Sequence, residues 1–332
     1  MKERYLSLDG WRGVSIAQVI AGHWFPVGLP SWDLNGPVAD SGMALFFILS
    51  GFLITTILLK DQSIKSFLIR RLARIVPLFW LVVILFFTLK DATTYQWIAN
   101  LLFFANIPPI DLVEGAQHFW SLSIEVQFYA FVAVLVALAG RRGLMMLPIV
   151  CLGVTAFRVM HGAYEEIETY FRADELLAGC VLALIYQSQF DGIKMAIGRL
   201  STPALFVLLI FSAHPASHQL AYARPYIAML VVGSTLFASE TYVVNRLLAI
   251  KPLVYFAQIS YAVYVFHGVL GSTWLGSGDT LERYLKRPLL CLVTWFLAHV
   301  STFYYEKRWI DAGKRWSQAI GDKERGALKE TL

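Results

Sequence analysis

Two ionisable residues, Arg12 and His23, lie eleven positions apart in the first strongly apolar segment of the chain. Eleven residues bring a helix to within about 20° of its starting direction, so both side chains would share one face, roughly 16 Å apart along the axis. An imidazole can take the proton of an attacking hydroxyl, and a guanidinium can bind phosphate through paired hydrogen bonds. We interpret His23 as a candidate general base and Arg12 as a candidate anion-binding group. The alternative for His23 is a hydrogen bond to a neighbouring helix.

Two arginines, Arg71 and Arg74, are spaced by three residues. This spacing places both on one helical face, where they could bind the phosphates of a polyanionic donor such as a coenzyme A thioester. The alternative is that they mark the cytoplasmic end of a membrane span, where arginine is common.

A third group, Ser121, Glu125 and Tyr129, has spacings of four residues and would also share one helical face. We interpret Glu125 as the carboxylate that orients the His23 imidazole, the role of the third group in a catalytic triad. The alternative is that Glu125 pairs with one of the arginines. Ser121 lacks the sequence of a nucleophile elbow, so we assign Ser121 and Tyr129 to substrate binding rather than to covalent catalysis.

The composition predicts a membrane protein, with 57% hydrophobic and 15% charged residues and a mean hydropathy of +0.58. The net charge of +5 does not indicate nucleic-acid binding, because the basic residues lie in short loops between apolar segments. The three cysteines are far apart and lie in apolar sequence. They predict neither a disulfide framework nor a metal site, and we expect no bound metal.

We predict an all-α fold of about ten transmembrane helices, because the chain contains apolar segments of membrane-spanning length. The helices would surround a polar site, because an ionisable group costs at least about 2.5 kcal/mol at mid-helix in lipid. The alternation of basic and non-basic loops places both termini in the cytoplasm. Residues 1–308 form the transmembrane domain, and residues 309–332 form a cytoplasmic tail that begins as an interfacial helix. Residues 97–107 are apolar but too short to cross the membrane. The expected spans are 13–28, 42–59, 74–89, 118–139, 144–160, 173–188, 203–213, 225–242, 253–271 and 287–305.

Four motifs then resemble the acyltransferase-3 family of bacterial membrane acyltransferases, and they occur in the family's order. They are LDGWRG at 8–13 followed by His23, LFFILSGFLI at 45–54, the Arg71–Arg74 pair running into Pro77, and WSLSIEVQFY at 120–129. Later segments agree with the resemblance: RADELLAG at 172–179, SYAVYVFH at 260–267, and Tyr305-Glu306.

The resemblance implies a multi-pass protein of the bacterial inner membrane that moves an acyl group, usually acetyl, from cytoplasmic acyl-CoA to a carbohydrate hydroxyl. It implies that Arg12, Arg71 and Arg74 hold the acyl-CoA, and it adds Arg172, Asp174 and His267 as candidate substrate-binding residues. Many members have a second acidic residue directly after the position of Glu125, where this chain has Val126.

The expected partners are membrane lipids and a carbohydrate acceptor, free or lipid-linked. Lipopolysaccharide, exopolysaccharide, peptidoglycan and small glycosides all remain open as acceptors. Some members carry a fused extracytoplasmic hydrolase-like domain, so a separate extracytoplasmic partner that completes the transfer is a further expectation. His23 either activates the acceptor directly or is itself transiently acylated.

Two other functions fit the same composition. A transporter or flippase of a lipid-linked sugar or anion also contains buried Arg, His and Glu, although the two halves of this chain show no repeat. A noncatalytic scaffold would not require Arg12 and His23 on one helical face.

Overall fold

The computed structural model describes residues 6–239 and 241–330, and within these ranges the regular elements are all helical. They divide into two compact units, one of residues 1–56 and 145–260, the other of residues 57–144 and 261–332. The divisions fall inside or at the end of three long helices, α2 (Asn35–Lys60), α5 (Trp120–Met145) and α13 (Lys251–Gly271).

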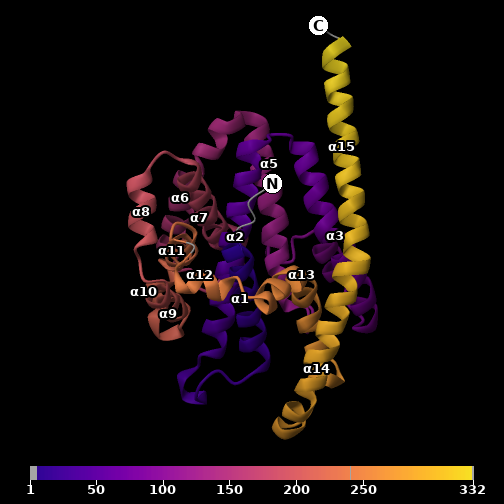
Figure 1. Cartoon of the computed structure of the whole chain (residues 1–332). Helices are drawn as coiled ribbons and strands as arrows, with labels where there is room; N and C mark the ends of the chain where they lie inside the picture. The colour runs from indigo at the N-terminus through magenta and orange to yellow at the C-terminus, as the bar shows by residue number, and fades with distance from the viewer. Residues whose placement is uncertain (1–5, 240, 331–332) are drawn as a thin grey trace. The chain divides into compact units, whose positions relative to one another are not determined.

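The first unit contains α1 (Leu6–Trp24) and the initial part of α2. Within it α6 packs on α7, and α11 packs on α7, α8 and α9 (Figure 1). The other helices of this unit are α6 (Leu147–His161), α7 (Thr169–Gln187), α8 (Asp191–Gly198), α9 (Thr202–Ser212), α10 (His218–Ala221), α11 (Arg224–Leu236) and α12 (Val243–Leu248).

The second unit contains α3 (Ile64–Leu89), α4 (Thr94–Leu101), most of α5, and α14 (Thr280–Val300). A π-helical segment, Ser301–Glu306, joins α14 to α15 (Lys307–Glu330) without a break. In Figure 1 the yellow α15 lies beside α3. Arg70 Nε donates to Ser317 Oγ at 2.9 Å, and Gly313 faces Ala73. The expected interfacial tail is therefore a helix through Glu330 whose first half packs on α3.

All ten expected spans coincide with helices, but not with the same bounds. The first helix begins at Leu6 and ends at Trp24, so Arg12, which precedes the expected span 13–28, lies in the second turn of the helix. The expected span 225–242 is shorter, because α11 ends at Leu236. Gly140, with a φ of 54°, kinks α5 just before Arg141 and Arg142, where the sequence predicts a loop.

Five helices of the described residues are long and apolar enough to cross a membrane, or up to seven if each bent pair counts as one span. The bent pairs are α7 with α8, at 120°, and α9 with the helical segment Pro215–Ala221, at 97°. Among the expected spans, α6 and α11 have only 15 and 13 residues. The polar residues of α1 lower its mean hydropathy, and α1 is not among the five helices. The number of ten crossings stays a prediction.

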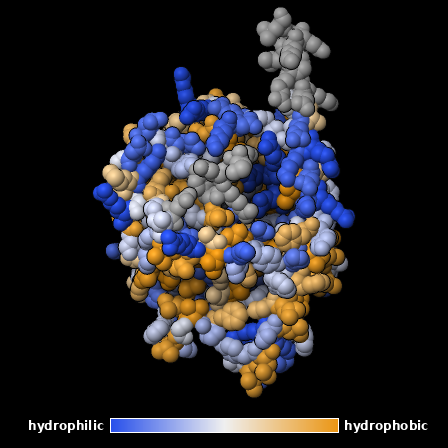
Figure 2. Space-filling model, in the orientation of Figure 1, coloured by the Kyte–Doolittle hydropathy of each residue, from blue (hydrophilic) through white to orange (hydrophobic). Residues whose placement is uncertain are grey.

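The surface agrees with a membrane location. Large hydrophobic side chains such as Leu85, Leu138 and Met160 are exposed by 59%, 83% and 80%. On the face shown in Figure 2, hydrophobic residues cover wide areas. Lipid is the medium in which such exposure costs little, so these helices belong to a membrane protein.

Candidate active site

Arg12 and His23 lie on one helix, α1, as their spacing predicts. Arg12 Nη2 donates to Ser260 Oγ at 3.3 Å, and Ser260 Oγ donates in turn to the Ala257 carbonyl at 2.9 Å. His23 is exposed near the end of the helix. An exposed imidazole is accessible to a substrate.

The His23 ring has two neighbours in the first unit. It hydrogen-bonds the Val19 carbonyl one turn earlier on α1, and it lies in the electrostatic field of the Asp40 carboxylate on α2. Gly22, the residue before His23, allows α1 and α2 to approach each other closely, because a Cβ at Gly22 would collide with the Asn35 carbonyl and with Ala39. Asp40 is therefore an acidic neighbour of the ring within the first unit.

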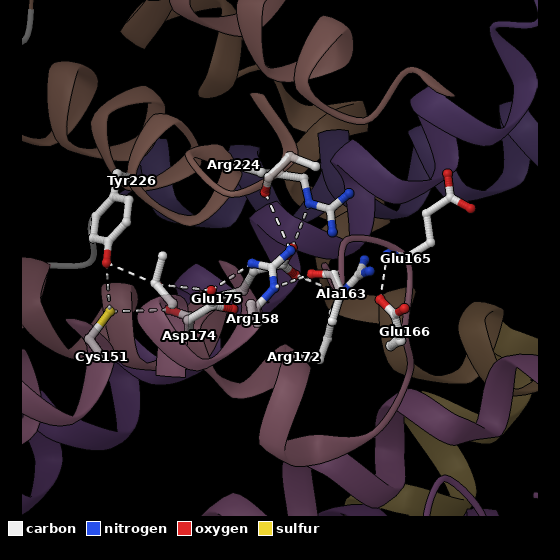
Figure 3. A network of polar contacts seen from close by, with 12 residues as sticks. Cys151, Arg158, Ala163, Glu165, Glu166, Arg172, Asp174, Glu175, Arg224 and Tyr226 are labelled. Atoms are coloured by element: carbon white, nitrogen blue, oxygen red, sulfur yellow. Dashed lines mark hydrogen bonds and ion pairs between the residues drawn. The ribbon is translucent and has the colours of Figure 1, made fainter. Parts of the chain in front are cut away.

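The first unit contains a network of buried charges around Arg172, Glu175 and Arg224 (Figure 3). Asp40 of the same unit lies at the edge of this network. Arg172 Nη2 lies 3.9 Å from Asp40 Oδ1, and Arg172 Nε lies 3.5 Å from Glu175 Oε2. Arg224 Nε donates to Glu175 Oε1 at 2.7 Å. Such paired charges are the form in which ionised groups are tolerated away from water.

A further pair in this network joins Arg158 of α6 to Asp174 of α7, with Nη1 and Oδ2 2.6 Å apart. Thr155 Oγ1 donates to the same Asp174 oxygen at 3.1 Å. The side chains of Arg158 and Asp174 are 1% and 0% exposed. This geometry gives Asp174 a structural contact, while its assignment to substrate binding stays a prediction.

Sequence reasoning found Arg172 and Asp174 but missed their partners. Asp40, Arg158, Glu175 and Arg224 come from four different helices, and no spacing along the chain relates Arg158 or Arg224 to the others. A signal was available for these two, because Arg158 in the last turn of α6 and Arg224 at the start of α11 are charged residues of otherwise apolar helices.

In the second unit, Arg71, Glu125 and Tyr129 lie close together. Tyr129 Oη donates to Glu125 Oε1 at 2.5 Å, one turn apart on α5, as their spacing predicts. Arg71, on α3, lies in the electrostatic field of Tyr129, Glu125 and Arg74. Glu125 therefore has an arginine neighbour, the alternative that the sequence left open.

Arg74 lies toward another acid, Glu306, at the end of the π-helical segment. Glu306 accepts hydrogen bonds from Ser301 Oγ at 3.0 Å and Thr302 Oγ1 at 3.1 Å. Tyr261 of α13 lies near Glu125, Glu306 and Arg74, and its hydroxyl donates to the Ile75 carbonyl at 2.6 Å. The two α3 arginines are thus set between carboxylates and phenols from α5, α13 and the π-helical segment.

Ser121 and His267 both contact Tyr264 in another part of the second unit. Ser121 Oγ and Tyr264 Oη are 2.6 Å apart. His267, 1% exposed, has Nδ1 2.6 Å from the Tyr264 carbonyl oxygen, and its ring centroid lies 4.5 Å from that of His118. The sequence assigned no role to His118.

The candidate residues of the two units are Arg12, His23, Arg172 and Asp174 in the first, and Arg71, Arg74, Ser121, Glu125, Tyr129 and His267 in the second. The expected contact between Glu125 and His23, and a passage shared by Arg12 with Arg71 and Arg74, stay predictions. Among residues 6–239 and 241–330, no three His, Cys, Asp or Glu side chains are grouped so as to hold a metal ion.

Comparison with known proteins adds independent information. A family model described as an acyltransferase domain matches residues 5–309. The peptidoglycan O-acetyltransferase OatA of Listeria monocytogenes is 28% identical over 309 residues, which are 79% of this chain and 48% of the relative. The O-acetyltransferase OatA of Staphylococcus aureus is 27% identical over 318 residues, 80% of this chain and 50% of the relative. The chain thus spans about half the length of these relatives. No solved structure matches it.

Proposed function

The chain belongs to the acyltransferase-3 family, and we propose on this basis that it is a membrane O-acetyltransferase that esterifies a hydroxyl group of a cell-surface carbohydrate. The observation that carries the proposal is the pairing of the family match with an exposed His23 on the helix that also holds Arg12. An accessible imidazole beside a carboxylate is a suitable general base for acyl transfer.

We propose peptidoglycan as the acceptor. The support is that one relative is named a peptidoglycan O-acetyltransferase and another an O-acetyltransferase. The acceptor sugar is proposed to be free or lipid-linked, with or without a separate extracytoplasmic partner. Lipopolysaccharide and exopolysaccharide are the competing acceptors.

In the proposed reaction, His23 takes the proton of the acceptor hydroxyl as its oxygen attacks the thioester carbonyl of acetyl-CoA. One ring nitrogen is hydrogen-bonded to the Val19 carbonyl, so we propose that the other ring nitrogen transfers the proton. The new C–O bond forms as the C–S bond breaks, and the proton passes from the imidazolium to the leaving thiolate. In the two-step route, His23 carries the acetyl group before the acceptor does.

We propose that Arg12, Arg71 and Arg74 bind the phosphates of acetyl-CoA at the cytoplasmic side. The guanidinium fork suits a phosphate, and the donor is made in the cytoplasm. Glu125 and Glu306, which lie near Arg71 and Arg74, would hold these side chains in place until the donor binds. Arg172, Asp174, Ser121, Tyr129 and His267 remain proposed acceptor-binding residues.

The protein is proposed to cross the bacterial inner membrane ten times, with both termini in the cytoplasm. The support is the distribution of basic residues, which gather in alternate loops and include Arg141 and Arg142 at the Gly140 kink.

The test is mass spectrometry of surface glycans from cells with and without the gene. The proposal expects acetyl esters on peptidoglycan that disappear with the gene. If acetyl esters are lost from another glycan, that glycan would replace peptidoglycan as the proposed acceptor. Unchanged acetylation of every glycan, with a glycan missing from the surface, would instead support a transporter or flippase.

A further inference from the structure

The first turns of α2 are fixed against the last turns of α1. Ser15 Oγ donates to the Gly42 carbonyl at 2.8 Å, and Gln18 Nε2 donates to Ser41 Oγ at 2.8 Å. One turn further, Gly22 is in direct contact with Ala39. This antiparallel register places Asp40 at the level of the helix end that carries His23.

Asn35 fixes that end of α1. Its Nδ2 donates to the Gly22 and Phe25 carbonyls, both at 2.7 Å, and its Oδ1 accepts from the Val27 amide at 3.2 Å. These bonds satisfy carbonyl groups that the helix leaves without partners at its C-terminus. The backbone on both sides of His23 is therefore bound to α2, the helix that carries Asp40.

Asp40 lies between two environments. Its side chain is 38% exposed, whereas the neighbouring Arg172 side chain is 3% exposed and continues into the Glu175–Arg224 pair. The same carboxylate also lies within electrostatic reach of the exposed His23. The Arg172 guanidinium lies beside the Asp40 carboxylate, and this carboxylate acts electrostatically on the His23 ring. The chain of charges thus runs from buried Arg224 to the reactive ring.

We propose that Asp40 is the positioning residue that holds His23 and stabilises its imidazolium during acyl transfer, a role that rests on the proposed function. No sequence motif indicated Asp40, and sequence reasoning assigned this role to Glu125. In the second unit, Glu125 is engaged by Tyr129 and Arg71. The carboxylate that supports His23 then belongs to the same unit as His23.

The first test needs no activity. The chain has seven histidines, so ¹⁵N-histidine labelling in lipid nanodiscs gives seven imidazole signals, and His23→Gln identifies the one from His23. Asp40→Asn is expected to move the His23 signal and to leave the other six in place, which also shows that the fold is kept. Asp33→Asn, at an exposed left-handed position that Asn tolerates, is the matched control and should move none.

A His23 signal that stays in place with Asp40→Asn, or that moves only with Glu125→Gln, would overturn the proposal. If Asp40→Asn moves all seven signals, the fold has changed, and Asp40→Glu is then compared with the natural sequence instead. This variant keeps the charge and should move the His23 signal alone.

The second test measures transfer from acetyl-CoA to purified muropeptides by the reconstituted full chain. Asp40→Asn should lower kcat by about 10²-fold and leave the KM for acetyl-CoA within about twofold, and Asp40→Glu should recover part of the loss. Equal effects on kcat and KM, or no recovery, would contradict a role through His23. No transfer by the unsubstituted chain would refute the proposed function, and the NMR comparison would still decide whether Asp40 acts on His23.

Discussion

Arg158 Nη1 lies 2.6 Å from Asp174 Oδ2, and this ion pair joins α6 to α7 with both side chains inaccessible to solvent. A buried pair of this kind depends on both partners, because removing one leaves the other charge without compensation. The same acid is a candidate substrate-binding residue in the acyltransferase-3 motif, so its two roles can be separated by experiment.

Asp174→Asn should lower the free energy of unfolding by about 3–5 kcal/mol, measured by denaturant titration in detergent micelles. The double variant Arg158→Met/Asp174→Leu, which removes both charges, should be less destabilised than Asp174→Asn. If Asp174→Asn keeps full stability and only raises the KM for the acceptor, Asp174 binds substrate and the structural role is refuted.

Gly22→Ala should destabilise the protein by about 1–3 kcal/mol, because the added Cβ would overlap the Asn35 carbonyl and Ala39. It should also lower acetyl transfer by displacing His23 from Asp40. Gly153→Ala is the control, since a Cβ at Gly153 meets nothing within 4 Å and alanine favours the helix. Equal behaviour of the two variants in thermal unfolding and transfer assays would count against the close approach of α1 and α2.

Arg71→Ala and Arg74→Ala should each raise the KM for acetyl-CoA about tenfold or more, because charge-assisted bonds to phosphate contribute roughly 1.5–3 kcal/mol. The adjacent Arg70, which is bonded to Ser317 and lies 3.8 Å from Asp61, is the control. Initial rates at varied acetyl-CoA concentration separate the three variants. A KM that responds to Arg70→Ala as strongly as to the other two would refute specific donor binding.

Tyr129→Phe removes the hydroxyl that donates to Glu125 at 2.5 Å. A buried hydrogen bond to a charged group contributes about 1.5–3 kcal/mol, so the free energy of unfolding should fall by that amount. Tyr304→Phe, at a position that is 63% exposed, should change it by less than about 0.5 kcal/mol. Unchanged stability of Tyr129→Phe would show that this bond does not support the Arg71–Glu125 cluster.

The features that the sequence predicted correctly are local ones. Arg12 with His23 and Glu125 with Tyr129 each lie on one helix because helical geometry fixes their separation. The sequence also predicts a loop at Arg141 and Arg142, where the structure has a kink at Gly140 within α5 rather than a loop.

The partners of these residues were not predictable in the same way. Asp40 meets His23 through the packing of α1 on α2, and Arg224 meets Glu175 across 49 positions of sequence. Such contacts depend on how the helices pack, and the spacing of residues along the chain does not specify this packing. The helix ends also differed from the prediction. The first span was expected to begin at residue 13, whereas α1 extends back to Leu6 and includes Asp9 and Arg12.

The central claim is that His23 performs the chemistry of acyl transfer. The direct measurement is transfer of radiolabelled acetyl groups from acetyl-CoA to muropeptides by the chain reconstituted in liposomes, comparing the natural sequence with His23→Ala at equal amounts of folded protein. We expect transfer by the natural sequence and a loss of at least about 10²-fold in the variant. Equal rates for the two proteins would contradict the account.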